Sequence, residues 1–230
     1  MGKFFIRVLS YSLIIFFLIA PLVVCAEQRE YIYGLDAYYN ERAGAILNAV
    51  DNEPINGQIK GYYESGKLYF EVLSKNGKEE GAALLYYESG KVKGRTPYKN
   101  GKREGVAIAY FESGKIKGET PYQNDLAEGV SKLYYESGQI EEESHYKNDK
   151  REGVARWYYE DGKLQLEKLY NNGKVEGVAK SFLQNGAVIE FQYIDNEAVS
   201  AVCIGKAGRK TSLTANEITR WNSGEAINCE

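Results

Sequence analysis

A repeat of 24 residues runs through most of this chain without a gap, and no other feature restricts the possible folds as strongly. Three residue series share this period. They are the glycines Gly57, Gly81, Gly105, Gly129, Gly153 and Gly177, the glycines Gly66, Gly90, Gly114, Gly138, Gly162 and Gly186, and the asparagines Asn52, Asn76, Asn100, Asn124, Asn148, Asn172 and Asn196. Because three independent series keep one frame, the chain is expected to be a tandem repeat array. Such an array indicates a binding or scaffolding surface, although the period does not identify what is bound.

One repeat, Gly105–Glu128, contains two short segments that favour β-structure and two turns. Val106–Phe111 is apolar and aromatic, and Ile116–Gln123 follows it after a Glu-Ser-Gly-Lys turn. Turn residues recur about every 12 positions, and no segment keeps the period of a helix. We therefore predict an all-β fold, an elongated single-layer antiparallel sheet of tandem 24-residue β-hairpins with six copies over residues 57–200.

The Ser-Gly turn also predicts how the two strands of a repeat pair. If Ser113 and Gly114 are the central residues of a two-residue loop, Phe111 pairs with Ile116, and Glu119 lies opposite Ile108. The same rule pairs opposite charges in other copies: Lys60 with Glu71, Lys132 with Glu143, and Arg156 with Glu167. A slip of one residue would break all of these pairs at once.

This register predicts two different faces. One face is apolar and aromatic and carries Ala107, Ala109, Phe111, Ile116, Gly118 and Tyr122. The other carries the charges and a tyrosine stripe, defined as Tyr62, Tyr86, Tyr110, Tyr134 and Tyr158, the first rings of successive aromatic pairs. The second ring of each pair is predicted to form a structural ladder. The stripe is the candidate binding site, because exposed tyrosines give contact area at low entropic cost.

The repeat unit resembles a known family. Its consensus is Gly-Val-Ala-x-x-Tyr-Tyr-Glu-Ser-Gly-Lys-Ile-x-x-Glu-x-x-Tyr-x-Asn-Gly-Lys-x-Glu, and it resembles the MORN repeat (membrane occupation and recognition nexus) in its bacterial variant form. The resemblance covers about residues 57–200. It implies an elongated sheet of successive β-hairpins and supplies no catalytic residues. Bacterial arrays of this kind often carry an antitoxin-like label by similarity, and eukaryotic arrays are associated with membrane lipids and protein scaffolding.

Residues 1–26 have the pattern of a secretory signal peptide. Lys3 and Arg7 precede the uncharged and mostly apolar Val8–Val24, and a signal-peptidase site ends at Ala26. This pattern predicts export to the periplasm, the outer envelope or the extracellular space. Two alternatives stay open. The segment could remain as an anchor, although it is short for a spanning helix, or Cys25 could be the acylated residue of a lipoprotein.

The repeat frame weakens at both ends. Residues 27–56 are predicted to hold a degenerate copy, because Tyr38-Tyr39 lie 24 residues before Tyr62-Tyr63. Residues 201–230 are predicted to form a cap, in which Thr214 and Glu217 fit a capping box for a short helix over Ala215–Asn222. Cys203 and Cys229 are an even pair in an export-targeted chain, which predicts a disulfide; two free thiols are the alternative.

Charge and residue inventory argue against several function classes. Cleavage after Ala26 would leave 27 Lys+Arg against 32 Asp+Glu, a net charge of −5, which argues against nucleic acid as a partner. His145 is the only histidine, and its equivalents in other copies are leucine, proline or tyrosine. The glutamates before the Ser-Gly turns recur too regularly to be a catalytic pair. We expect no enzymatic activity, no metal site and no cofactor.

Three functions fit these observations. The leading hypothesis is an exported, non-enzymatic repeat scaffold that binds protein partners through an extended β-sheet surface. The alternative is a cell-wall glycan-binding module that uses the tyrosine stripe, and the second alternative is binding to a lipid surface. The apolar face of a single-layer sheet is an exposed patch unless curvature or a partner covers it, and a homodimer is one solution.

Overall fold

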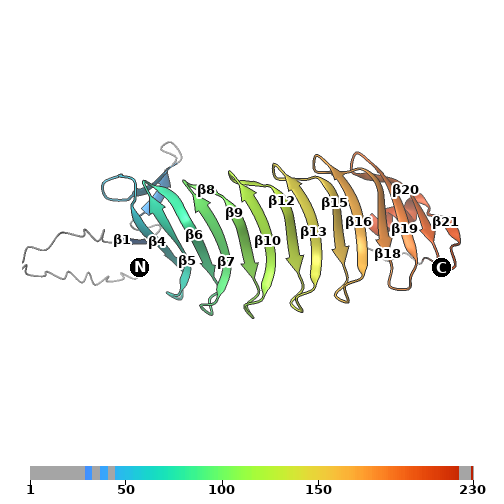
Figure 1. The fold of residues 1–230 in the computed structure, drawn as a ribbon, viewed down its shortest axis with the longest axis horizontal. Coiled ribbons are helices and arrows are strands. Elements are labelled where there is room, and N and C mark those ends of the chain that lie inside the picture. Colours follow the sequence, from blue (N-terminus) through green and yellow to red (C-terminus); the bar gives the residue numbers. More distant parts are fainter. Residues whose placement is uncertain (1–28, 33–36, 41–44, 223–228, 230) are drawn as a thin grey trace, which may run out of the picture.

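The computed structural model describes residues 29–32, 37–40, 45–222 and 229, and this part of the chain is almost entirely β-structure (Figure 1). One sheet of 19 strands runs the length of the molecule, beside a second sheet of two strands and one short helix. The predicted fold class is therefore confirmed. The predicted signal peptide, Cys25, residues 27–28, 33–36 and 41–44 of the expected degenerate copy, and residues 223–228 and 230 of the expected cap lie outside the described residues.

The long strands follow one another across the sheet in chain order, and each is antiparallel to the next. They are β4 (Gly57–Tyr62), β5 (Leu68–Lys75), β6 (Lys78–Tyr86), β7 (Val92–Lys99), β9 (Gly105–Tyr110), β10 (Ile116–Gln123), β12 (Gly129–Tyr134), β13 (Ile140–Lys147), β15 (Gly153–Tyr158), β16 (Leu164–Asn171), β18 (Gly177–Phe182), β19 (Val188–Ile194), β20 (Glu197–Ile204) and β21 (Lys210–Ser212). The short strands β8 (Lys102–Arg103), β11 (Leu126–Ala127), β14 (Lys150–Arg151) and β17 (Lys174–Val175) lead from one copy into the next. At the N-terminal edge, β1 (Arg29–Ile32) pairs in parallel with β4.

The asparagine series forms the tight turns between copies. Asn100 and Gly101 have φ angles of 53° and 79°, and the flanking residues Lys99 and Lys102 pair with each other. Positive φ at both central residues is the mark of a type I′ turn, whose twist matches that of the strands it joins. Asparagine and glycine enter this left-handed region at low cost, which explains why this pair recurs at the copy boundaries.

The Ser-Gly turn is wider than the predicted two-residue loop. The Gly114 N–H donates to the Phe111 carbonyl at 2.8 Å, and the Phe111 N–H donates to the Lys115 carbonyl at 2.8 Å. Gly114 has a φ of 90° and is the left-handed residue of a G1-type bulge. As a consequence Ile116 pairs with Tyr110, and the predicted pairing of Ile116 with Phe111 is wrong.

A second irregularity restores the predicted register farther from the turn. The pairing shifts between Ile116 and Gly118, so that Lys117 is an extra residue on its strand, and Glu119 then lies opposite Ile108 as predicted. The turn displaces the pairing by one residue from the predicted register, and the bulge displaces it by one residue in the opposite direction, so the two displacements cancel. The predicted pairs Lys60–Glu71, Lys132–Glu143 and Arg156–Glu167 are confirmed.

Neighbouring copies are hydrogen-bonded along both long edges of the sheet. At one edge Tyr63, Tyr87, Tyr135 and Tyr159 donate from their hydroxyls to the carbonyls of Tyr86, Tyr110, Tyr158 and Phe182, at 2.6 to 3.0 Å. At the other edge the main-chain N–H groups of Asn100, Asn124, Asn148 and Asn172 donate to the carboxylates of Glu80, Glu104, Glu128 and Glu152, at 2.8 to 2.9 Å. The second ring of each aromatic pair therefore has the structural role predicted for it.

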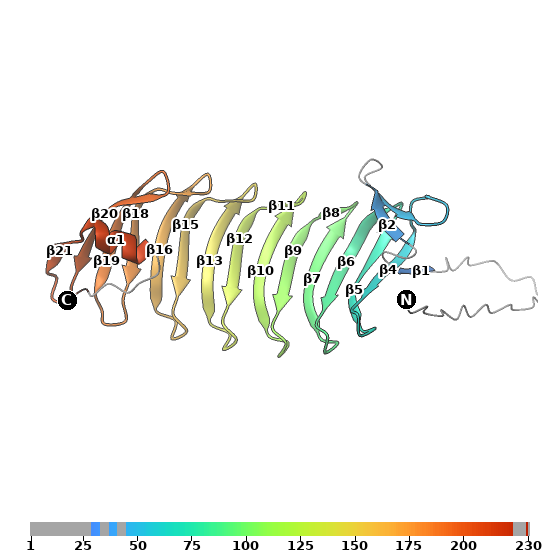
Figure 2. The same cartoon turned by 180° about the vertical axis from the view of Figure 1, so that it is seen from behind.

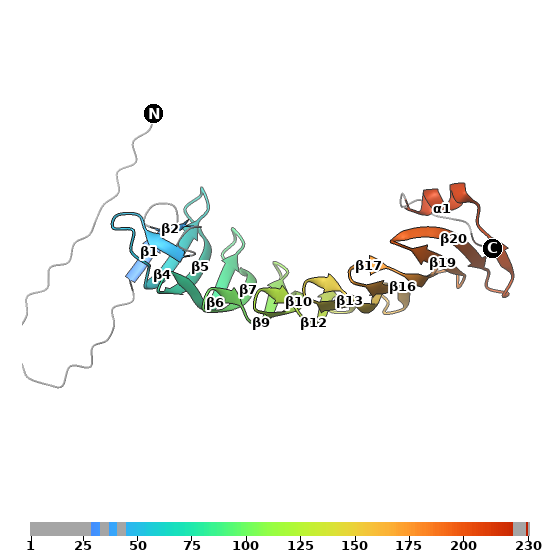
Figure 3. The ribbon, with the colours of Figure 1, turned by 90° about the horizontal axis from the view of Figure 1, so that it is seen from above.

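The sheet is curved, and separate elements cover the two ends of its concave face (Figures 2 and 3). At the N-terminal end, β2 (Ala37–Asn40) and β3 (Ala45–Asn48) form their own two-stranded sheet, and Ile46 packs with Ile55, Ile59 and Val72. Within the segment expected to hold a degenerate repeat, β1 joins the long sheet as a parallel strand at its edge, whereas β2 and β3 fold over the concave face. The described part of this segment therefore does not add a further antiparallel hairpin to the array.

At the C-terminal end, the helix α1 (Ala215–Asn222) has the predicted bounds and the predicted capping box, in which Thr214 N–H donates to the Glu217 carboxylate at 2.7 Å. Trp221 stacks on Phe191, with ring centroids 5.3 Å apart, and the predicted Cys203–Cys229 disulfide is present. In the described part of the chain, no helix is long and apolar enough to cross a bilayer.

Candidate functional site

The tyrosine stripe lies on the convex face, opposite the covering elements. Its members are the last residues of β4, β6, β9, β12 and β15, and Tyr62 is the most exposed, at 46%. Two hydroxyls are already engaged: Tyr86 donates to Glu71 at 2.6 Å and Tyr134 donates to Glu119 at 2.8 Å. Burial, followed by these hydrogen bonds, raises the pKa of both tyrosines to about 12. The stripe thus forms part of the charged face as predicted, and ligand contact by it stays a prediction.

A second tyrosine series lies on the concave face. Its members are Tyr98, Tyr122, Tyr146 and Tyr170, at the same 24-residue spacing, with Tyr193 following in the last copy. Sequence reasoning placed Tyr122 on the aromatic face but did not recognise this row as a surface of its own. The sequence does contain a signal for this row, because a tyrosine recurs every 24 residues on the second strand of each of these copies. The first four rings are partly buried and Tyr193 is buried, and the concave face is open between the two covered ends (Figure 3).

Arginines are inserted between the rings of this row. The Arg103 guanidinium lies 4.0 Å from the centre of the Tyr122 ring and forms an ion pair with Asp125 at 3.5 Å. Arg151 lies within 5.5 to 5.8 Å of three ring centres, those of Tyr146, Trp157 and Tyr170. A guanidinium over ring faces is stabilised by the ring quadrupoles, so these arrangements hold both partners in place.

Glu142 organises the centre of the concave face. Its carboxylate accepts hydrogen bonds from Arg151 Nη2, from Trp157 Nε1 at 3.0 Å and from Ser144 Oγ at 2.6 Å. Ser144 is fully buried, whereas the Arg151 Nε atom is buried without a partner among the described residues. These residues form a polar and aromatic cluster, called the platform below, in which the Glu142 carboxylate is paired with the Arg151 guanidinium.

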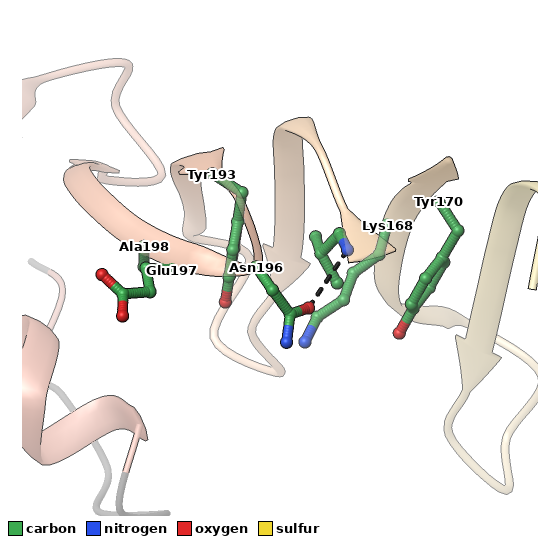
Figure 4. Close-up of a pocket in the computed structure, with 7 residues that line it drawn as sticks. Lys168, Tyr170, Tyr193, Asn196, Glu197 and Ala198 are labelled. Atoms are coloured by element: carbon green, nitrogen blue, oxygen red, sulfur yellow. Dashed lines mark hydrogen bonds between the residues drawn. The ribbon is translucent and has the colours of Figure 1, made fainter. Parts of the chain in front are cut away.

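A pocket of about 540 Å³ adjoins this platform (Figure 4). It is lined by Lys168, Tyr170, Val175, Tyr193, Asn196, Glu197 and Ala198. The Lys168 ammonium lies 5.5 Å from the centre of the Tyr193 ring. Burial lowers the pKa of this ammonium, and the neighbouring Arg151 guanidinium lowers it further. The pocket therefore holds a partly buried cation that forms no ion pair within the described part of the chain.

The described residues show no other reactive arrangement. Among them no group of His, Cys, Asp and Glu could hold a metal ion. His145 is exposed and lies opposite Val130 in the register of β12 and β13.

The sequence profile of the MORN repeat variant matches five tandem segments, residues 55–76, 79–100, 103–124, 127–148 and 151–172. Together they span residues 55–172, half of the chain, and β18 to β20 continue the hairpins beyond the last match. No curated protein sequence matches this chain. Among solved structures, the crystal structure of the GtfA/B complex bound to UDP and GlcNAc is similar over 63% of this chain and 25% of that chain, with 11% identity and a TM-score of 0.23.

Proposed function

The chain belongs to the MORN repeat family, and on that premise we propose that it is a non-enzymatic scaffold that binds an extended segment of a protein partner along the open centre of its concave face. The observation that carries the proposal is the row of rings and arginines between two covered ends. Rings held by guanidinium groups lose little freedom when a ligand packs on them, and arginine and aromatic residues dominate binding energy at protein interfaces.

The spacing of the row suits an extended chain. Two strands add about 10 Å along the sheet, whereas an extended peptide advances about 3.3 Å per residue. A segment lying along the long axis would therefore bring about every third side chain over a new ring, from Tyr98 to Tyr170. The covers at the two ends, β2–β3 and α1, limit the available length to the central copies.

Export is part of this proposal. It is supported by the basic and apolar leader of residues 1–26 and by the disulfide between Cys203 and Cys229, a bond typical of oxidising compartments. The mass of the native N-terminus tests it directly. A chain that begins at Glu27 means cleavage and release, an acylated Cys25 means a lipid tether, and an intact Met1 in membrane-bound protein means an uncleaved anchor. An intact Met1 in protein recovered from the cytoplasm would contradict the proposal.

Site-specific photo-crosslinking tests the binding face. A photoreactive phenylalanine analogue would replace Tyr122 on the concave face or, as the matched control, Tyr110 on the convex face. In cells that produce the natural partners, crosslinks to a discrete protein from position 122 and not from position 110 would support the proposal. Crosslinks from position 110 alone would transfer the binding site to the tyrosine stripe, and none from either position would count against a protein partner.

A second candidate function is glycan binding, and Trp157 favours it. The indole lies on the concave face with its N–H held by Glu142, so the ring is fixed next to polar groups that could bond to sugar hydroxyls. Sedimentation with purified cell-wall polymer separates the two candidates. Co-sedimentation that is lost in Trp157→Ala but kept in Tyr110→Ala would favour the glycan, while no sedimentation would remove this candidate.

A further inference from the structure

Lys168 breaks the pattern of its own position in the repeat. The equivalent residues on the second strands of the preceding copies are Val72, Thr96, Thr120 and Ser144, all uncharged. Lysine at this position places one ammonium group on the concave face, between Tyr170 and Tyr193 (Figure 4). Among the equivalent positions of these copies only Lys168 is charged, so this position distinguishes its copy from the preceding ones.

The carboxylates considered as partners for Lys168 are either bound to other side chains or exposed to solvent. Glu142 is bound to Arg151 and Trp157, and Asp195 forms an ion pair with Lys174 at 3.1 Å. Glu197 lines the pocket but is exposed to solvent. In the described part of the chain, no carboxylate forms an ion pair with Lys168, and the like charge of Arg151 lowers the pKa of its ammonium.

Asn196 adds a second hydrogen-bond donor to the same pocket. Its Oδ1 atom accepts a hydrogen bond from the Val175 N–H at 3.1 Å, and this bond sets the orientation of the amide. The Nδ2 donors are thereby turned away from the main chain. In Figure 4 the Asn196 amide nitrogen and the Lys168 ammonium point in the same direction. A partly buried cation and an adjacent amide donor, without an acceptor between them, form a site that an acceptor with one negative charge completes.

We propose that this pocket binds a carboxylate, specifically an acidic side chain of the extended segment that the scaffold holds, a proposal that rests on the function given above. One uncompensated positive charge matches a monoanion, whereas the exposed Glu197 at the rim disfavours a dianion such as phosphate. The carboxylate would accept hydrogen bonds from Lys168 and Asn196 while a flanking residue of the segment packs on the partly exposed Tyr170. Because the other copies carry neutral residues here, this contact sets the position of the segment along the array.

Calorimetric titration of the full mature chain tests the proposal. The probes are a blocked hexapeptide that contains one glutamate and tyrosine residues, and the same peptide with glutamine. We expect the wild type to prefer the glutamate peptide about tenfold, the worth of a charge-assisted hydrogen bond. Lys168→Gln should abolish the preference, and Lys168→Arg should keep it. Lys132→Gln makes the same charge change on the convex face and should leave the preference intact.

Equal affinity for the two peptides, or an unchanged preference in Lys168→Gln, would overturn the subsite. Tighter binding of inorganic phosphate than of the glutamate peptide would overturn the carboxylate assignment, and selective binding of a glucuronate oligomer would overturn the peptide as its source. Circular dichroism of each variant verifies that it folds. If crosslinks form from position 122 while Lys168→Gln has no effect, the scaffold role stands without the subsite. If the wild type prefers the glutamate peptide but no partner is crosslinked, the carboxylate subsite stands without the scaffold role.

Discussion

The hydroxyl of Tyr135 donates a 2.7 Å hydrogen bond to the main-chain carbonyl of Tyr158, 23 residues farther along the chain. This bond joins the turn of one copy to the first strand of the next copy. Tyr63, Tyr87 and Tyr159 repeat it, while Phe111 occupies the same position without a hydroxyl. The array thus contains its own example of a copy that lacks this bond.

Removing the bond should weaken the array without disturbing its shape. Because Phe111 shows that the ring alone fits the position, we expect Tyr135→Phe to lower the free energy of unfolding by about 1 kcal/mol, the usual net worth of one such bond. Urea unfolding followed by circular dichroism measures this. Phe111→Tyr is the reciprocal variant, and a gain of similar size would support the same account. No loss in Tyr135→Phe would show that the bond is replaced by water at no cost.

Two glycines of the asparagine turns should differ sharply in their tolerance of alanine. Gly77 and Gly101 occupy equivalent positions with φ of 72° and 79°, so a side chain strains the backbone similarly in both, by about 1 kcal/mol. A Cβ at Gly77 would also lie 2.7 Å from the Ala45 Cβ and 2.9 Å from the Ile46 carbonyl oxygen, whereas at Gly101 the nearest atom is 3.4 Å away.

We therefore expect Gly77→Ala to cost about 2 kcal/mol more than Gly101→Ala, since overpacking adds to the strain. It should also release β3 from the concave face, which amide hydrogen exchange at Ala45–Asn48 would detect. Equal effects of the two substitutions would contradict the contact between this turn and β3.

Loss of the disulfide should release the C-terminal helix before the array unfolds. Cys203 and Cys229 are separated by 26 residues, and a bridge across such a loop is worth about 3 kcal/mol. In the double variant Cys203→Ser, Cys229→Ser, we expect Trp221 to leave its stack on Phe191. Fluorescence in a Trp157→Phe background would report Trp221 alone. Unchanged emission would show that the apolar contacts of α1 suffice.

Alkaline pH should break the hydrogen bond between Tyr86 and Glu71 on the convex face. Burial and then the hydrogen bond to Glu71 raise the pKa of Tyr86 from 10.0 to about 12. The folded chain therefore holds this proton more tightly than the unfolded chain. The corresponding stability is complete below pH 10 and is lost as the pH rises through about 12. The difference in tyrosinate absorbance between wild type and Tyr86→Phe should titrate near the higher value, and a midpoint near 10 would refute the contact with Glu71.

Much of the fold followed from the period. The hairpins and the cross-strand pair Lys132–Glu143 were predictable from the repeat frame. The helix Ala215–Asn222 was predictable from its capping box, and the Cys203–Cys229 bond from an even number of cysteines after the predicted signal peptide. The exact form of the Ser-Gly turn was not, since a two-residue loop and a bulged turn give the same register a few residues away.

The Lys168 pocket lay beyond sequence reasoning for a different reason. Lys168 belongs to one copy, and Tyr193 and Asn196 belong to the next. The difference between Lys168 and the equivalent residues of the other copies has meaning only when the neighbouring copy is placed beside it. The same holds for Arg151, which meets rings from three strands. A search for residues that recur in every copy does not detect a residue that differs in one copy only.

The sequence by itself determined a linear array of hairpins, because a fixed period of turn residues specifies each copy and its pairing with the next. Only the tertiary structure decided that the sheet curves, that β2–β3 and α1 cover the two ends of one face, and that rings and cations converge in the open centre. The physical reason is that curvature and end packing arise from contacts summed over many copies and from segments outside the repeat, and neither leaves a mark on any single repeat.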